Sequence, residues 1–205
     1  MPLRPDADTL HTLAAELTAM AAEDQRVRAD LLAEGVLFDG YQPRMAEVHH
    51  RNAVRLATIM SELGWPRRSL VGRTGADAAW LVLQHAIGDP PVMRHGLELL
   101  RTLPPGEVDP IQVAMLEDRV RTFSGLPQIY GTQFDWDEQG EMQPRPIQDA
   151  ARVDERRAAI GLPPLAEKLR EIRDALHGHG EKMPADAEAR RREIDAWERL
   201  VGWHD

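Results

Sequence analysis

The chain has 205 residues, of which 42% are hydrophobic and 29% are charged, a balance typical of a chain that folds into a globular domain. Its formal net charge of −9 argues against nucleic acid or an anionic membrane as a partner, because phosphate binding depends on clustered Lys and Arg. The absence of cysteine excludes disulfides, thiolate metal sites and cysteine nucleophiles.

The start of the chain gives an expectation about location. Its first ten residues, MPLRPDADTL, lack an apolar run followed by a small-residue cleavage site. No segment approaches the roughly 18 apolar residues that a membrane-spanning helix needs. We therefore expect a cytoplasmic protein without a membrane partner.

Two long amphipathic helices are predicted in the first third of the chain. The first begins near residues 6–9, where an Asp or a Thr can cap it, and ends at Gly35. The second begins near Pro43 and ends at Gly64, since Pro66 cannot continue it. Apolar side chains recur at helical spacing in both.

Three further helices follow. One begins at Thr74 and includes the segment AAWLVLQHAI at 78–87, which is apolar nearly all round. Such a pattern predicts a central, buried helix, because no face of it is suited to water. The next two begin where an Asp is followed by a Pro, at 89–90 and at 109–110.

The chain then changes from helical to strand periodicity. Aromatic and β-branched residues around a turn signal at 139–140 predict a small β-hairpin over about 128–147. Helices are predicted at about 149–160, 164–177 and 185–201, with a loop at 177–184. The sequence therefore predicts a mainly α fold: a compact multi-helix domain with the hairpin at 1–165, and C-terminal helices at 166–205 that pack on it or serve in association.

Several polar side chains stand on helix faces that are otherwise apolar. Burying such a group without a partner costs on the order of 1–3 kcal/mol, so each needs a compensating role. Helical phase places Asp24 on the core side of the first helix, and His49 and Asn52 on the core side of the second. Gln84 and His85 lie within the most hydrophobic segment of the chain, which is the strongest anomaly.

The segment after residue 110 adds further candidates. Asp118 continues the inward line of its helix, with Arg119 beside it. A regular strand would place Gln128 and Tyr130 on one face of the hairpin and Gln133 on the other. Two interpretations of all these polar residues stay open. One is a buried hydrogen-bond network that fixes helix packing, and the other is a functional cluster of titratable groups around a cavity.

Metal-binding and nucleotide-binding motifs are not found. His49 and His50 are adjacent, so their rings lie about 100° apart on a helix and do not share a face as the HExxH ligands do. A metal at His49 would need ligands from elsewhere in the chain, and we expect neither a metal nor another cofactor. The sequence has no GxSxG, GxxxxGK or GxGxxG motif.

Six ordered motifs resemble those of a bacterial family known only as a domain of unknown function. They are DQRVR at 24–28, GWP at 64–66, AAWLVLQHAIGDP at 78–90, LEDRV at 116–120, GLPQIYGTQF at 125–134 and VDERRAAIGLPPL at 153–165. In shorter form the pattern reads DQxxR, GWP, QHAxxDP, DRV and QxYGTQ. Together the motifs cover roughly residues 10–165.

The resemblance implies a set of recurring polar positions but no activity. These positions are Asp24, Gln25, Arg28, Asn52, Gln84, His85, Asp118, Arg119, Gln128, Tyr130, Gln133, Arg156 and Arg157. The resemblance also implies an acidic residue where this chain has His49, which argues against a role for His49. Helical phase and resemblance agree on Asp24, Asn52, Gln84, His85 and Asp118.

The leading hypothesis is a small metal-independent enzyme with hydrolase-like or lyase-like chemistry on a small polar or anionic molecule. His85 would act as general acid or base, Asp118 would set its tautomer, and Tyr130 would polarise the reacting group. Without a cysteine or a serine motif, acid–base chemistry or water activation is favoured over covalent catalysis. Substrate-binding side chains are expected at Gln84, Arg119, Gln128, Gln133, Asn52, Asp24 and Arg156.

Two other functions stay open. The first is a non-catalytic binding module, in which the same amide, Tyr and Arg side chains recognise a small polar ligand or a peptide. The second is a structural or interaction protein with a buried polar network. In that case the terminal helix would use Trp197 and Trp203 to form a homo-oligomer.

Overall fold

The computed structural model describes residues 6–37, 40–179 and 186–205, and it is mainly helical, as the sequence predicts. These residues form eight α-helices, one short 3-10 helix and one two-stranded sheet, and none of the helices has both the length and the apolar character needed to cross a membrane. The chain divides into two compact units, residues 1–109 and 110–205. The domain boundary predicted at 165–166 falls inside the second unit.

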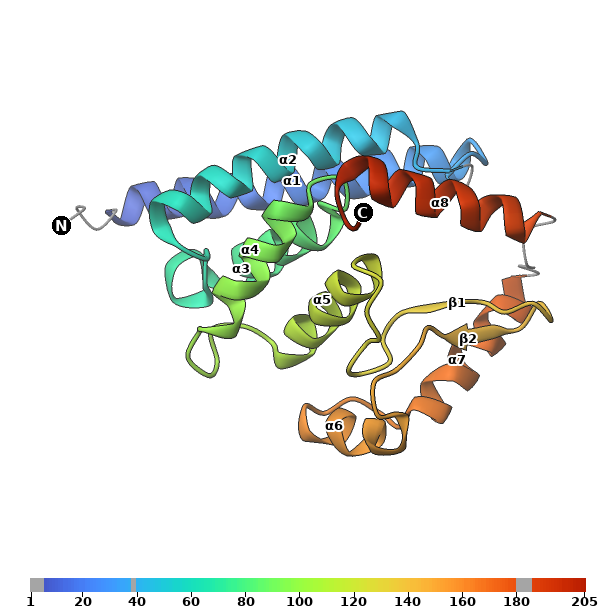
Figure 1. Ribbon diagram of the computed structural model, residues 1–205. Helices are drawn as coiled ribbons and strands as arrows, with labels where there is room; N and C mark the ends of the chain where they lie inside the picture. The colour runs from blue at the N-terminus through green and yellow to red at the C-terminus, as the bar shows by residue number, and fades with distance from the viewer. Residues whose placement is uncertain (1–5, 38–39, 180–185) are drawn as a thin grey trace. The chain divides into compact units, whose positions relative to one another are not determined.

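Four helices form the first unit. They are α1 (Ala7–Ala33), α2 (Pro43–Leu63), α3 (Arg68–His85) and α4 (Pro90–Arg101). Helix α1 packs along α3 and against α2, and α4 contacts both α2 and α3. Figure 1 shows α3 and α4 on the same side of the α1–α2 pair.

The ends of α1 and α2 follow the predicted signals. The Asp6 carboxylate accepts a hydrogen bond from the Thr9 backbone N–H at 2.8 Å and so caps α1. Gly64 ends α2 with a φ of 72°, a left-handed conformation that favours glycine.

Helix α3 begins earlier than predicted. It starts at Arg68 instead of Thr74, because a turn before a kink at Gly72 (φ 69°) runs on into the main helix. No side chain caps this start, so the sequence carries no signal for it. The later part of α3 is buried, as its apolar pattern predicts, and Ala79 and Leu83 have no exposed surface.

Side chains from all four helices build the core of the first unit. Its most buried large members are Leu17, Leu31, Leu56, Ile59, Leu83, Met93 and Leu100. Each contributes about 1.5–3 kcal/mol by leaving water. At Gly96 the backbone of α4 comes very close to α3, since a Cβ there would lie 2.5 Å from Leu83 Cδ2. The same packing buries the polar residues Asp24, His49 and Asn52, which lie on the apolar faces of α1 and α2.

The second unit mixes short helices with one hairpin. Its elements are α5 (Pro110–Phe123), β1 (Phe134–Trp136), β2 (Met142–Pro144), a 3-10 helix (Ala150–Arg152), α6 (Val153–Ala159), α7 (Leu165–His179) and α8 (Ala187–Val201). Helix α7 contacts both β2 and α6. The predicted helices are confirmed, with α7 ending at His179, two residues beyond its predicted end at 177. Residues 180–184 of the loop expected at 177–184 lie outside the described part of the chain.

The predicted β-hairpin is confirmed but shorter than expected. Strands β1 and β2 form an antiparallel pair of three residues each. Residues 128–133 are not a strand, apart from one isolated bridge between Gln128 and Ile147. The expected alternation of faces along 128–133 does not hold, because N–H groups of this segment bond to the Asp118 carboxylate instead of to a neighbouring strand.

Three aromatic side chains join α5 to the C-terminal segment. The ring centroid of Phe123 lies 5.0 Å from that of Trp203 and 6.2 Å from that of Trp197. Trp203 is almost completely buried. The two tryptophans expected to serve in self-association therefore pack inside their own unit, while Leu200 of α8 stays exposed.

Gly131 allows a direct test of the packing of the 128–133 segment. It has a φ of 68°, and a Cβ there would lie 3.0 Å from both Ile147 Cδ1 and Leu165 Cδ1. We expect Gly131→Ala to lower the free energy of unfolding by about 2–3 kcal/mol, of which about 1–2 kcal/mol comes from the left-handed backbone and the rest from crowding. Urea denaturation measures this loss.

Gly125→Ala is the matched control. Gly125 has a φ of 70°, but no atom lies within 4 Å of the Cβ position, so this variant loses only the backbone contribution. Equal losses in the two variants would contradict the close packing around Gly131.

Candidate functional site

The carboxylate of Asp24 is the centre of the candidate site. It lies in the second half of α1 and has no exposed surface, in agreement with its helical phase. Gln25 Nε2 donates a hydrogen bond to Asp24 Oδ1 at 3.1 Å. The other oxygen, Oδ2, faces side chains from α2 and α3. An ionised group at this depth needs such partners, because it has lost its contact with water.

Two histidines from different helices meet at Asp24 Oδ2. His85, the last residue of α3, has its Nδ1 2.8 Å from this oxygen, and His49 of α2 has its Nε2 3.1 Å from it. The two ring centroids are 5.1 Å apart. His85 keeps 22% of its side chain exposed, against 9% for His49. The group therefore reaches the protein surface through His85.

Tyr41 completes this group, which we call the Asp24 cluster: Asp24, His49, His85 and Tyr41. The Tyr41 hydroxyl and His49 Nδ1 are hydrogen-bonded at 2.8 Å. Burial, with smaller contributions from the negative charges of Asp89 and Asp24, raises the pKa of Tyr41 well above its ordinary value. Burial alone would raise the pKa of Asp24, but its interactions with His49 and His85 outweigh burial and hold that pKa far below the usual range. The cluster therefore contains an ionised carboxylate and a neutral phenol.

One nitrogen of the cluster lacks a hydrogen bond. His49 Nε2 is buried and has no hydrogen-bond partner among the described residues, although Asp24 Oδ2 is only 3.1 Å away. Because 3.1 Å is within hydrogen-bonding distance, it is the orientation of the His49 ring relative to this oxygen that prevents a hydrogen bond. A buried polar atom without a hydrogen bond costs about 1–3 kcal/mol. Stability alone therefore does not explain this arrangement.

Two residues predicted to bind substrate lie in the same unit as the Asp24 cluster. Asn52 is buried, and its Nδ2 donates a hydrogen bond to the Met20 carbonyl at 3.3 Å, which ties α2 to α1 one turn before Asp24. Gln84 is half-buried and precedes His85 on α3. Asn52 therefore supports the packing of α1 on α2 beside Asp24, while Gln84 is a chain neighbour of His85.

The Asp118 carboxylate organises a loop of the second unit. It has no exposed surface and accepts hydrogen bonds from the backbone N–H groups of Ile129, Tyr130 and Thr132 at 2.6, 3.0 and 3.0 Å. The Thr132 hydroxyl adds a fourth bond at 2.9 Å. These bonds hold residues 128–133, which we call the Asp118 loop, against α5.

The contacts of His85 and Asp118 correct the pairing expected from the sequence. The carboxylate that bonds His85 Nδ1 is that of Asp24, and the oxygens of Asp118 bond to the Asp118 loop. Helical phase identifies which side chains point inward, but it does not identify which of them meet. The carboxylate partner of His85 is therefore Asp24 and not Asp118.

Other predicted residues also support the Asp118 loop. Gln128 has no exposed surface, donates hydrogen bonds to the carbonyls of Gln133 and Arg145 at 3.0 and 2.7 Å, and accepts one from the Gln133 N–H at 2.9 Å. Arg119 Nε donates to Gln133 Oε1 at 3.4 Å, and burial lowers the pKa of Arg119. Gln128 and Gln133 thus hold the loop's shape.

Two arginines of α6 bond to the backbone of the Asp118 loop and of neighbouring segments. Arg156 donates hydrogen bonds of 2.8–3.1 Å to the carbonyls of Ile129, Gln148 and Asp149. Arg157 donates hydrogen bonds of 2.7–3.2 Å to the carbonyls of Tyr130, Gly131 and Pro163. Arg157 is 1% exposed, and only the family resemblance singles it out. Both guanidinium groups therefore serve the protein's own backbone.

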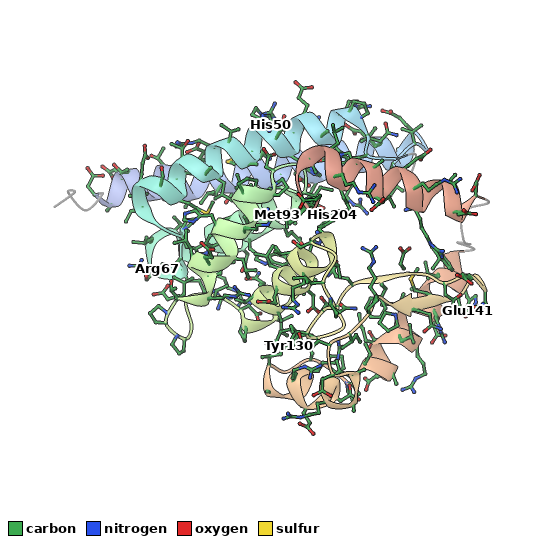
Figure 2. The ribbon with its side chains drawn as sticks, in the orientation of Figure 1. His50, Arg67, Met93, Tyr130, Glu141 and His204 are labelled. Atoms are coloured by element: carbon green, nitrogen blue, oxygen red, sulfur yellow. The ribbon has the colours of Figure 1, made fainter. Side chains whose placement is uncertain are left out.

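Two members of the Asp24 cluster, Tyr41 and His49, are not among the site residues predicted from the sequence. Tyr41 lies in the loop after α1, where no periodicity marks it. Helical phase places His49 on the inward stripe of α2 with Asn52, but the family resemblance argues against a role for it, and the structure brings it to Asp24. The adjacent His50, labelled in Figure 2, is 67% exposed and contacts Asp89.

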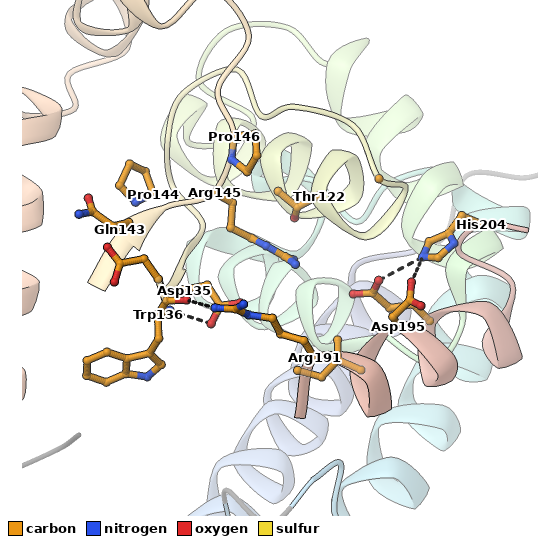
Figure 3. A pocket seen from close by; sticks show the side chains of 14 residues that line it. Thr122, Asp135, Trp136, Gln143, Pro144, Arg145, Pro146, Arg191, Asp195 and His204 are labelled. Carbon is orange, nitrogen blue, oxygen red and sulfur yellow. Dashed lines mark hydrogen bonds and ion pairs between the residues drawn. The ribbon is translucent and has the colours of Figure 1, made fainter. Parts of the chain in front are cut away.

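A cleft of about 580 Å³ lies in the second unit, lined by the region of β1 and β2 and by α8. Figure 3 shows the side chains of Arg145 and Arg191 pointing into it. At one end, His204 Nε2 lies 3.2 Å from Glu198 Oε2 and 3.7 Å from Asp195 Oδ1. None of the residues predicted from the sequence lines this cleft.

The sequence of this chain matches a known protein family. A family model described as a family of unknown function (DUF6624) matches residues 11–183. The chain belongs to this family. The DUF6624 match includes the Asp24 cluster and the Asp118 loop and leaves out α8. No curated protein and no solved structure matches the chain.

Replacing Asp118 by Asn tests the role of this carboxylate in the DUF6624 fold. In Asp118→Asn, an NH₂ group replaces one of the two carboxylate oxygens, so two N–H donors of the Asp118 loop lose their acceptor. We expect the free energy of unfolding to fall by about 3 kcal/mol. Asp135→Asn is the control, because the described contact of Asp135 is with the N–H of its neighbour Trp136. Urea denaturation measures both variants, and a loss no larger for Asp118→Asn than for Asp135→Asn would refute the proposed role.

The His204 contacts predict a pH dependence of stability. The hydrogen bond with Glu198 raises the pKa of His204, and the Asp205 carbonyl adds to this effect. Because the pKa is higher in the folded state, the contribution to stability is complete below about pH 6.5 and disappears as the pH rises through the raised value. We expect His204→Gln to lower Tm more at about pH 5.5 than at about pH 8.5. Thermal denaturation at both pH values checks this, and an equal effect would count against it.

Proposed function

We propose that this DUF6624 protein is a small enzyme that carries out acid–base chemistry, of a hydrolase-like or lyase-like kind, at the Asp24 cluster. The observation that carries the proposal is the contact of 2.8 Å between Asp24 Oδ2 and His85 Nδ1, in which the carboxylate is fully buried and the imidazole is partly exposed.

The geometry of this pair suits proton transfer. A histidine whose Nδ1 is held by a buried carboxylate has a fixed ring orientation, and the carboxylate stabilises the ring when it gains a proton. The 22% exposure of the His85 side chain leaves a route for a small molecule. Asp24 and His85 together thus provide a proton acceptor at the surface of the first unit, in which Asp24 is the positioning residue.

The helical framework supports this proposal. Asp24, His49 and His85 come from α1, α2 and α3, so their positions are set by the packing of three helices. Side chains on packed helices are held more closely than side chains on loops. The alternative, a buried network that only fixes helix packing, does not explain why His49 Nε2 lacks a hydrogen bond.

The composition of the chain narrows the reaction and the substrate. A chain without cysteine and without a serine-nucleophile motif favours direct proton transfer or water activation. We propose a small polar molecule as substrate. We do not require an anionic group on it, because Arg156, a cationic side chain expected to bind substrate, donates its hydrogen bonds to backbone carbonyls in the second unit. The net charge of −9 argues against nucleic acid as a partner.

The proposal predicts a selective loss of turnover in His85→Gln. The purified protein is assayed with a panel of small esters, amides, lactones and hydroxy acids, and the variant is compared on each compound that turns over. We expect kcat to fall by about 10²–10⁴, the usual contribution of a general acid or base, with a smaller change in KM. His95→Gln is the control, because His95 lies on α4 and is 51% exposed.

Three outcomes would contradict the enzyme proposal. Full turnover in a folded His85→Gln variant removes His85 from the chemistry. Binding of a panel compound without turnover indicates a binding module. No turnover on the whole panel, together with a large fall in Tm for His85→Gln, indicates a structural network.

A further inference from the structure

We infer that Asp24, His49 and His85 together bind a divalent first-row transition-metal ion. The three residues each offer one ligand atom, a carboxylate oxygen and two imidazole nitrogens, and these atoms all lie within 4.8 Å of one another. No motif in the sequence marks this site, since its ligands come from three separate helices.

The distances suit a shared metal ion. Ligand atoms about 2.0–2.2 Å from one ion stand roughly 3.0–3.5 Å apart, depending on the coordination geometry. Asp24 Oδ2 lies 2.8 Å from His85 Nδ1 and 3.1 Å from His49 Nε2. These two separations are close to those expected for ligands of one ion, and the third, between the two imidazole nitrogens, is no more than 4.8 Å.

The state of His49 is a second and independent observation. Its Nε2 is buried, lacks a hydrogen-bond partner among the described residues, and lies 3.1 Å from Asp24 without pointing at its oxygen. A metal ligand needs a nitrogen whose lone pair is not already taken by a hydrogen bond, and His49 Nε2 meets this condition. An ion bound there would supply the missing partner and remove the cost of burying an unpaired nitrogen.

Contacts on the outer side of the ligands hold them in place. The Tyr41 hydroxyl bonds His49 Nδ1 at 2.8 Å, and Gln25 Nε2 bonds Asp24 Oδ1 at 3.1 Å. Metal-binding histidines almost always bond through their second nitrogen in this way, which fixes both the tautomer and the ring orientation. Tyr41 and Gln25 thus act as positioning residues.

The donor set indicates the class of ion. Two imidazoles and one carboxylate favour ions such as Zn²⁺, Fe²⁺ or Mn²⁺, whereas Mg²⁺ and Ca²⁺ prefer oxygen ligands alone. Three protein ligands leave at least one coordination position for water, which is the pattern of a catalytic site rather than a closed structural site. The partial exposure of His85 gives that position a route to solvent.

This inference deepens the proposed function and rests on it for the class of reaction only. An ion held by these three residues would supply a bound water with a pKa of about 7, and so a site for water activation at neutral pH. His85 Nδ1 would then hold the ion, and the activated water would take over the role of proton acceptor or nucleophile. The ion thus supplies the water activation expected of a hydrolase-like or lyase-like site.

Zinc binding to the chelator-treated full chain tests the inference. We expect isothermal titration calorimetry to give one tight Zn²⁺ per chain, with a Kd at or below about 1 µM. His49→Ala and His49→Gln should weaken this site by at least about 100-fold, and Tyr41→Phe by about 10–100-fold, because the latter removes only an outer contact. Two variants at His49 are used because one of them could disturb packing, and circular dichroism with chelator present checks that each is folded.

Two control variants separate this site from other histidines. His50→Ala removes the exposed neighbour of His49 on the same helix. His204→Ala removes a ligand from the second group, Asp195, Glu198 and His204, whose ligand atoms also lie within 4.8 Å of one another. Both controls should bind Zn²⁺ as tightly as the unchanged chain. With Co²⁺ in place of Zn²⁺, visible absorption bands should appear in both controls at the same Co²⁺ concentration as in the unchanged chain, and only at much higher concentration in the His49 variants.

The outcomes distinguish the two proposals. No binding at about 100 µM Zn²⁺, unchanged binding in folded His49 variants, or loss of binding in His204→Ala would overturn the metal site. If metal-free protein turns over a substrate and His85→Gln abolishes this, the proposed function stands without the ion. If Zn²⁺ binds as expected and no panel compound turns over, the metal site stands and the enzyme proposal falls.

Discussion

A carboxylate that has lost all contact with water stays ionised only where neighbouring groups replace the hydration that it has given up. For Asp24 these groups are the imidazoles of His49 and His85, at 3.1 and 2.8 Å from one oxygen. They belong to α2 and α3, so the contact forms only when both helices pack against α1. The packing of the apolar core in the first unit therefore brings Asp24, His49 and His85 together. The contacts among these three side chains compensate for placing polar groups within that core.

The two buried aspartates of this DUF6624 protein show how the surroundings of a carboxylate indicate its role. Asp24 and Asp118 both have no exposed surface. Asp118 accepts four hydrogen bonds from the Asp118 loop and is satisfied by the protein itself. Asp24 stands beside a buried nitrogen that lacks a hydrogen bond, and beside an imidazole that opens to solvent. The first arrangement satisfies the carboxylate with the protein's own donors, whereas the second leaves a buried nitrogen without a hydrogen bond, which supports the proposed metal site.

The sequence predicts the helices well because their signals are local. Asp6 and Gly64 mark helix ends, and the apolar stripes place Asp24 and Asn52 inside. Pairing between helices is not local, so the sequence alone joins His85 to Asp118 instead of Asp24. The residues of the Asp118 loop have strand-like composition, yet side-chain acceptors take their N–H groups, a contact that no propensity scale contains.

The central claim is that Asp24, His49 and His85 act together as one ligand set. X-ray absorption spectroscopy of the zinc-loaded protein tests it most directly, because the spectrum reports the atoms around the ion. We predict two imidazole nitrogens and at least one oxygen at about 2.0–2.2 Å, with the imidazole signal reduced to one ring in His49→Gln. A spectrum with no imidazole contribution, or one that changes in His204→Gln and not in His49→Gln, would contradict the account.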